Sequence, residues 1–281
     1  MNILVCIKPV PDPEKYGQLQ MDPKTKRLVR EGIPSVINPA DRNALEEALR
    51  IRSAYGGRIT VLSMAPVFSR DKIMESLAMG ADAAYLISDA AFGGADTYAT
   101  SYVLAAAVRK MEKEGGADAT SGAFDLILAG NESADGATAH VPVQLARWLG
   151  LPHLCNVNRI EIAPEAGKEA GSGAGIKLWK KTETGRLVLE GRLPVVAAVT
   201  KDINKPRLVN AMGIIQAKKK PLTIWSNAQL QLDPRRTGLA GSPTQPGELM
   251  TPDLARQAED LGSDAKEAAG RILAIIEKAG V

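Results

Sequence analysis

The sequence predicts an α/β fold: a mostly parallel, doubly wound, Rossmann-like sheet with a small antiparallel section and a C-terminal arm. Short apolar runs alternate with amphipathic helical segments over residues 1–150, which is the βαβα pattern of a parallel sheet with right-handed crossovers. Apolar residues make up 45% of the 281 residues but aromatic residues only 4%, so the core must be built from Ala, Val, Ile and Leu. Such aliphatic cores are typical of parallel strands covered by helices.

The first half of the chain supplies the alternating elements, and local signals bound them. A proline-rich run, Lys8–Pro13, ends the first strand, and Gly56, Gly80 and Gly150 each end a helix. Residues 18–29 are expected to form an exposed hairpin. Strands are expected at 3–7, 59–62, 84–87 and 126–129, with helices beginning near 38–41, 73, 98 and 141. Because ligands of such sheets bind at the carboxyl ends of the strands, the loops that follow these strands are the candidate binding loops.

The second half of the chain has a different pattern. Short antiparallel strands are expected at 157–162, 176–179 and 186–189, a buried strand at 194–199 and an edge strand at 217–225. Residues 226–252 contain Pro, Gly and Ser without apolar periodicity, which is typical of an extended arm. Apolar residues at helical spacing beyond Leu254 suggest a terminal helix, broken near Gly262. We therefore expect an α/β domain over 1–225, followed over 226–281 by an arm and a helix.

The loop over residues 130–139 joins a buried strand to the helix that begins near Val141. Its small residues let a backbone approach a ligand, and the helix N-terminus offers unpaired N–H groups to an anion. Asp135 and Thr138 could cap the helix or hold a sugar or phosphate. An ordinary βα turn explains the same residues equally well from this loop alone.

Two further loops, Phe92–Thr97 and Asp202–Arg207, can each be interpreted as a functional loop or as an ordinary structural one. Phe92–Thr97 is glycine-rich and leads into a helix; it only weakly resembles the loop that wraps pyrophosphate in ATP pyrophosphatases. A tight turn with Asp96 or Thr97 as helix cap is slightly favoured over a phosphate site.

Asp202–Arg207 contains one apolar residue, Ile203, among charged neighbours. That layout fits a docking loop or a plain surface loop.

Composition excludes several classes of function. With only two histidines and two isolated cysteines, we expect neither a hydrolase triad, nor a histidine metal site, nor a disulfide framework. A net charge of +3 argues little for nucleic acid binding, and Lys218–Lys220 is more simply a solvated strand end than a phosphate patch. No apolar run approaches bilayer length and the N-terminus enters a strand directly, so we expect a cytoplasmic protein without membrane insertion.

Several motifs taken together resemble the beta subunit of electron-transfer flavoproteins, and a subset of them resembles its electron-bifurcating group. The matching pieces, in family order, are Val5-Cys-Ile-Lys8, Asn38-Pro-x-Asp41, Leu77-Ala-Met-Gly-Ala-Asp82, Asp125-Leu-Ile-Leu-x-Gly130, Asp135-Gly-x-Thr138, Leu193-Pro194, Ala217-Lys-Lys-Lys-Pro221 and Gly241-Ser-Pro-Thr-Gln245. Each piece is weak alone, but the ordered set is specific.

The resemblance implies an adenine-nucleotide-binding α/β fold that binds FAD, with AMP as the alternative, and that takes electrons from NADH. It implies three partners: an alpha subunit carrying its own FAD, an acyl-CoA dehydrogenase, and either ferredoxin or flavodoxin. The implied cofactor-binding residues are Cys6, Asn38, Asp41, Met64, Gly94, Asp96, Thr97, Gly130, Asn131, Asp135, Gly136, Ala137, Thr138, Ala139, His140 and Val141. The implied docking residues are Asp202, Ile203, Asn204, Lys205, Pro206 and Arg207.

Two other functions stay open at this point. The family also has conventional members, which hold a structural AMP and pass on electrons from acyl-CoA dehydrogenases. Ala137 stands where the bifurcating group usually has Asp, and His140-Val141-Pro142 replaces its usual Gln-Val-Gly, which keeps AMP as an alternative. A nucleotide-binding regulatory domain without a redox role is the second alternative.

Overall fold

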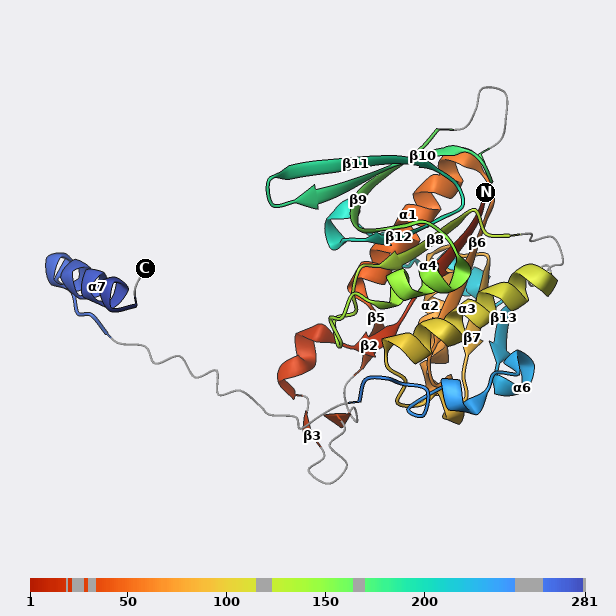
Figure 1. Cartoon of the computed structure of the whole chain (residues 1–281), viewed down its shortest axis with the longest axis horizontal. Coiled ribbons are helices and arrows are strands. Elements are labelled where there is room, and N and C mark those ends of the chain that lie inside the picture. Colours follow the sequence, from red (N-terminus) through yellow and green to blue (C-terminus); the bar gives the residue numbers. More distant parts are fainter. Residues whose placement is uncertain are drawn as a thin grey trace. The chain divides into compact units, whose positions relative to one another are not determined.

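The computed structural model describes residues 1–18, 20–21, 28–29, 34–114, 123–163, 170–245 and 260–279 (Figure 1). The chain divides into two compact units, Met1–Gln245 and Pro246–Val281. The first unit therefore extends past residue 225, where the sequence suggested that the α/β domain ends. The short helices α6 (Asn227–Leu230) and η6 (Pro234–Arg236) belong to it.

One large sheet forms the centre of the first unit. Within the described residues it has nine strands in the order β11-β10-β9-β12-β8-β1-β6-β7-β13. Their bounds are β1 Asn2–Cys6, β6 Arg58–Met64, β7 Ala83–Ile87, β8 Leu126–Gly130, β9 His153–Ala163, β10 Gly175–Thr182, β11 Gly185–Arg192, β12 Val195–Val199 and β13 Leu222–Trp225. From β9 to β13 all neighbours are parallel, and β9, β10 and β11 are joined antiparallel. The mostly parallel sheet that the sequence predicted is thus confirmed.

Helices cover both faces of this sheet. α1 (Pro39–Tyr55) and α2 (Arg70–Met79) pack on the face that carries Ile3 and Val5. α3 (Thr97–Glu114) and α4 (Val141–Leu149) pack on the other face, which carries Leu4 and Cys6. Alternate residues of β1 therefore enter two separate cores, as period-two strand geometry requires. This is the doubly wound arrangement, and Figure 1 shows the α3–α4 layer lying over the strands.

The ends of the helices follow from local sequence. Proline stands in the first turn of α1 and α4, where its missing N–H costs nothing. Gly150 adopts φ 74° after α4, a left-handed conformation that allows its N–H to reach the carbonyls of Ala146 and Arg147. Two small antiparallel pairs flank the sheet: β2 (Pro9–Pro11) with β5 (Ser35–Ile37), and β3 (Gln20–Met21) with β4 (Leu28–Val29). The second pair confirms the expected hairpin.

The predicted edge strand over 217–225 is partly wrong. The helix α5 (Ala211–Ala217) ends at Ala217, and only β13 is a strand, at the sheet edge beside β7. Lys220, between them, is not a solvated strand end: its Nζ donates to the carbonyl oxygens of Leu77 at 3.0 Å and Ala81 at 2.6 Å. Its partial burial lowers the pKa of the Lys220 ammonium. One lysine of the run therefore fixes the end of α2.

The second unit contains α7 (Ala265–Ala279), which begins after Gly262, where the sequence predicted a break. Leu254, the first residue of the predicted terminal helix, lies outside the described residues. The contact of this C-terminal segment with an alpha subunit stays a prediction. Across the described ranges, none of the helices is both long enough and apolar enough for a membrane crossing.

Candidate functional site

Asp41 joins three elements at the carboxyl edge of the sheet. Its carboxylate is buried in the first turn of α1, where Oδ2 accepts the Lys8 N–H at 2.8 Å and Oδ1 accepts the Gly130 N–H at 2.9 Å. A Cβ on Gly130 would lie 2.3 Å from Asp41 Oδ1, so only glycine fits at the end of β8. Asp41 therefore fixes where the chain leaves β1 and β8.

Burial controls the protonation of two groups at this junction. Desolvation raises the pKa of the Asp41 carboxyl to about 7, although hydrogen bonds from Asn38, Lys8 and Gly130 and the charge of Lys8 act in the opposite direction. Burial, and then the negative charge of Asp41, raise the pKa of the Cys6 thiol to about 12. Cys6 is consequently a neutral core thiol at physiological pH rather than a reactive thiolate.

Asn38, just before α1, holds the loop that follows β8. Its Nδ2 donates to the Glu132 carbonyl at 2.9 Å, and its Oδ1 accepts the Ala134 N–H at 3.0 Å. The side chains of Asn38 and Asp41 are thus engaged with the chain itself, and they build the loop. Direct contact of either residue with an adenylate stays a prediction, as does that of Met64, which is half-buried at the end of β6.

The loop before α4 has an unusual backbone. Ala137 adopts φ 46° and Ala139 φ 55°, both left-handed. For residues other than glycine this conformation costs about 1–2 kcal/mol each, and such strain concentrates at binding sites. Thr138 between them is exposed, and Gly136 and Val141 flank this stretch. Of the two alternatives for this loop, the helix cap by Asp135 or Thr138 is not formed: His140 occupies the N-cap position without a side-chain cap hydrogen bond.

Asp135 instead forms an ion pair. Its Oδ1 lies 2.7 Å from Lys8 Nζ, which also lies 3.3 Å from Ser133 Oγ. Asn131, earlier in the loop, accepts the Asn156 N–H on Oδ1 at 3.0 Å, and its own N–H donates to the Val199 carbonyl at 2.8 Å. The loop is therefore attached to β1, β9 and β12. Sequence reasoning missed the side chain of Lys8 as a site group, because no local signal pairs it with Asp135.

The glycine-rich loop after β7 is in contact with a distant segment of the same chain. Asp96 caps α3 as expected, since its Oδ1 accepts the Ala99 N–H at 2.9 Å. Its Oδ2 also accepts the Thr244 N–H at 3.0 Å, and its own N–H donates to Ser242 Oγ at 2.8 Å. Gly94 adopts φ 73°, and a Cβ there would lie 3.3 Å from Leu239 Cβ. We call residues 237–244 the covering segment.

The covering segment explains why this loop contains glycines: they allow a close backbone contact with another part of the same chain. The backbone approach that we expected a ligand to make is made here by Leu239, whose N–H donates to the Gly93 carbonyl at 3.1 Å. Arg236, just before the segment, stacks on Tyr102 of α3 with 4.1 Å between its Cζ and the ring centroid. A nucleotide contact of Gly94, Asp96 or Thr97 stays a prediction.

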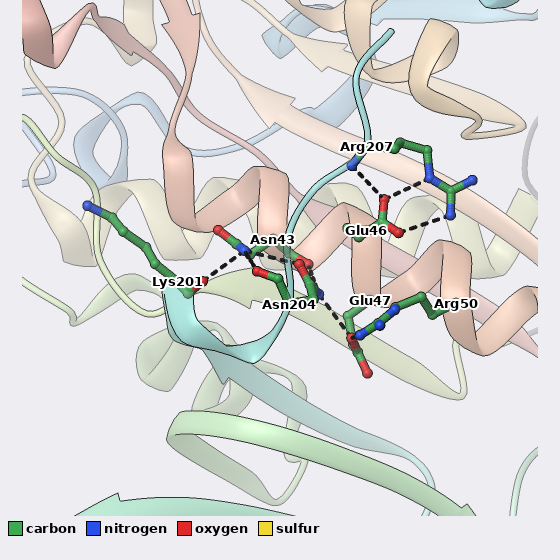
Figure 2. Close-up of polar contacts among 7 residues, drawn as sticks. All are labelled: Asn43, Glu46, Glu47, Arg50, Lys201, Asn204 and Arg207. Atoms are coloured by element: carbon green, nitrogen blue, oxygen red, sulfur yellow. Dashed lines mark hydrogen bonds and ion pairs between the residues drawn. The ribbon is translucent and has the colours of Figure 1, made fainter.

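The predicted docking loop lies against α1 (Figure 2). Asn204 donates from Nδ2 to Glu47 Oε2 at 2.9 Å and to the Asn43 carbonyl at 3.0 Å, and Asn43 Nδ2 donates to the Lys201 carbonyl at 3.0 Å. Arg207 forms an ion pair with Glu46. A short 3-10 turn, η5 (Lys201–Ile203), begins the loop. The loop is therefore held against α1 through Asn204 and Arg207.

Ile203 is also not the exposed anchor that the sequence suggested. It is partly buried and packs against the α1–α2 core. The exposed aliphatic residue is Leu208, directly after Arg207, with 86% of its surface accessible. Asp202 and Lys205 are exposed and Pro206 is half-buried. Periodicity could not locate the exposed residue, because a loop has no fixed buried face.

The fold and these loops define a Rossmann-like α/β protein whose candidate site lies at the carboxyl edge of its parallel strands. No cluster of three or more His, Cys, Asp or Glu suited to a metal occurs in the part of the chain that the structure describes.

A family model described as "Electron transfer flavoprotein domain" matches residues 25–230. The chain is 40% identical over 269 residues to an electron transfer flavoprotein subunit beta of Thermoanaerobacterium thermosaccharolyticum, covering 95% of each chain. It is 37% identical over 278 residues to the subunit beta of Clostridium acetobutylicum, covering 99% and 98%. It is 38% identical over 280 residues to the caffeyl-CoA reductase-Etf complex subunit CarD of Acetobacterium woodii, again covering 99% and 98%.

The chain therefore belongs to the electron transfer flavoprotein family, as a beta subunit. As such it takes part in electron transfer together with an alpha subunit.

Proposed function

We propose that the chain binds FAD at the carboxyl edge of its sheet and takes electrons from NADH. It divides them between ferredoxin or flavodoxin and, through the FAD of the alpha subunit, an acyl-CoA dehydrogenase. The observation that carries the proposal is the pair of left-handed alanines, Ala137 and Ala139, in the loop that leads into α4. Backbone strain at non-glycine residues persists where the surrounding structure enforces it, and such residues cluster at functional sites. Phosphate binding at a helix N-terminus is a recurrent function of this kind.

The residues present suit the adenylate and diphosphate parts of such a cofactor. Gly136, Thr138 and Ala139 carry small side chains that let an anion approach the backbone, whereas the Ala137 N–H already donates to the Ser133 carbonyl at 2.8 Å. The dipole of α4 favours an anion by up to about 2 kcal/mol. Asn38 and Asp41 fix the two strand ends and the start of the loop. When bound, FAD supplies the one- and two-electron redox chemistry, whereas the chain positions it and sets its electrostatic surroundings.

Binding of the nicotinamide nucleotide, NADH, is assigned to the loop that contains Gly94, Asp96 and Thr97. The covering segment shapes this loop, because Leu239, Ser242 and Thr244 all contact it.

Docking of the dehydrogenase is assigned to residues 202–208, where a loop held rigidly on α1 presents Leu208 to solvent. A preorganised loop loses little entropy on binding, and an exposed aliphatic residue with a charged rim suits a transient partner.

Two alternatives remain. In the first the site holds a structural AMP and the chain is a conventional beta subunit. In the second the nucleotide has only a regulatory role. The cytoplasmic location stays a prediction in either case.

The phosphate loop is tested by adding a charge at Ala139. Ala139→Glu and the neutral control Ala139→Gln impose similar bulk and backbone strain, so they differ mainly in charge. Copurified with the alpha subunit, the Glu variant should lose the nucleotide of the beta subunit and the Gln variant should retain more of it. Equal nucleotide content in both variants and in wild type would contradict the proposal.

A further inference from the structure

Lys8 and Asp135 form an ion pair at the edge of the strained loop. Lys8 Nζ lies 2.7 Å from Asp135 Oδ1, with the Asp135 side chain 11% exposed and that of Lys8 48% exposed. Lys8 stands two residues after the end of β1, and its backbone N–H is fixed by Asp41. The ammonium thus extends from a rigid strand end to the loop, which begins on a neighbouring strand.

We propose that Lys8 is the residue that makes this loop receptive to a phosphate anion, because it neutralises the carboxylate of Asp135. The inference rests on the proposed function and goes further by naming the residue that selects phosphate-bearing nucleotides over uncharged nucleosides. Lys8 acts here as a specificity-determining residue, and its effect passes through Asp135.

The electrostatic argument follows from the position of Asp135. Asp135 stands two residues before the first left-handed alanine, so its carboxylate belongs to the loop assigned to the diphosphate. An uncompensated carboxylate within about 6 Å of a phosphate would weaken phosphate binding by about tenfold at the effective dielectric of a protein surface. The Lys8 ammonium, in direct contact with Oδ1, cancels most of that field. The affinity for a nucleoside without phosphate should not depend on the charge of Lys8.

The test is a double-mutant cycle on the full chain, with ADP and adenosine as probes in calorimetric titrations. Lys8→Met should weaken ADP binding by about tenfold and leave adenosine binding unchanged. Asp135→Asn alone should strengthen ADP binding, because the net charge at the loop becomes more positive. The double variant Lys8→Met/Asp135→Asn should recover ADP affinity to within about threefold of wild type.

Lys219→Met is the matched control. Lys219 is exposed and precedes β13, at the amino ends of the parallel strands, so its removal takes away the same charge far from the loop. It should lower ADP affinity by less than about twofold. Thermal unfolding of each variant checks that the fold is intact.

Three results would overturn the inference. ADP binding by Lys8→Met that equals wild type would show that the ion pair has no role in binding. A double variant as weak as Lys8→Met would show that Lys8 does not act through Asp135. Equal loss of ADP and adenosine binding in Lys8→Met would show that Lys8 does not discriminate between a nucleotide and a nucleoside. Wild-type chain that bound neither probe would instead overturn the proposed function itself.

Discussion

Arg207 and Glu46 are joined by two nearly parallel hydrogen bonds across the gap between the docking loop and α1. Arg207 Nε lies 2.7 Å from Glu46 Oε2, and Arg207 Nη2 lies 3.0 Å from Glu46 Oε1. Oε2 also accepts the Arg207 N–H at 3.1 Å. Glu46 therefore holds both the side chain and the backbone of the last residue in the predicted docking loop. This bidentate geometry is the strongest form of a carboxylate–guanidinium contact.

A double-mutant cycle on Arg207→Leu and Glu46→Gln should give a coupling energy of about 1 kcal/mol, since Glu46 is largely buried while Arg207 is partly solvated. Urea unfolding provides the measurement. The exposed pair Arg235–Asp233 serves as control and should show no measurable coupling. If the two cycles gave the same result, the Arg207–Glu46 contact would not hold the loop.

Truncation of two aliphatic residues separates packing from docking. Ile203→Ala should lower the free energy of unfolding by about 1–3 kcal/mol, because its side chain packs on the core. Leu208→Ala should leave stability within about 0.5 kcal/mol and weaken electron delivery to the dehydrogenase. Transfer kinetics at varied dehydrogenase concentration give the second readout. Transfer that depended on Ile203 but not on Leu208 would favour the anchor that the sequence suggested.

The raised pKa of Asp41 predicts a pH-dependent stability. The pKa of about 7 in the folded state lies above the ordinary aspartate pKa of 3.8, so the folded state binds more protons between these pH values. This contribution to stability is fully present below about pH 4, falls as pH rises through 7, and is absent above that. Unfolding free energies at pH 5 and pH 8 should show the loss in wild type.

Asp41→Asn should remove that pH dependence. It should also cost about 1–3 kcal/mol, because the amide offers one acceptor where Lys8 and Gly130 present two backbone donors. A variant that kept the wild-type difference between pH 5 and pH 8 would show that another group titrates.

Two left-handed glycines test the covering segment. Gly238 has φ 55°, and a Cβ there would lie 2.2 Å from the Ala91 carbonyl oxygen, whereas Gly150 has φ 74° with open space around it. Gly150→Ala should cost only the backbone strain, about 1–2 kcal/mol. Gly238→Ala should in addition displace the segment from Gly94 and Asp96. Hydrogen exchange at residues 237–244 should rise in Gly238→Ala alone; similar exchange in both variants would argue against a tightly held segment.

The sequence predicted the sheet well, because β8 and β12 are buried on both faces and so appear as continuous apolar runs. It failed at α5, where Met212, Ile214 and Ile215 are exposed and only Ala217 is buried, so no amphipathic face marks a helix. Most contacts within the candidate site could not be predicted from the sequence. Asp96 and Ser242 lie 146 residues apart in the sequence, and Lys8 and Asp135 lie 127 apart. Local patterns carry no information on such pairs.

The central claim is that the beta subunit itself holds a flavin at the edge of its parallel sheet. The most direct measurement is the number of FAD and AMP equivalents released on denaturation per heterodimer with the alpha subunit, which carries one FAD of its own in the proposed scheme. The account predicts about two FAD per heterodimer in wild type and about one in Ala139→Glu. One FAD and one AMP in the wild-type heterodimer would contradict it and assign the chain to the conventional beta subunits.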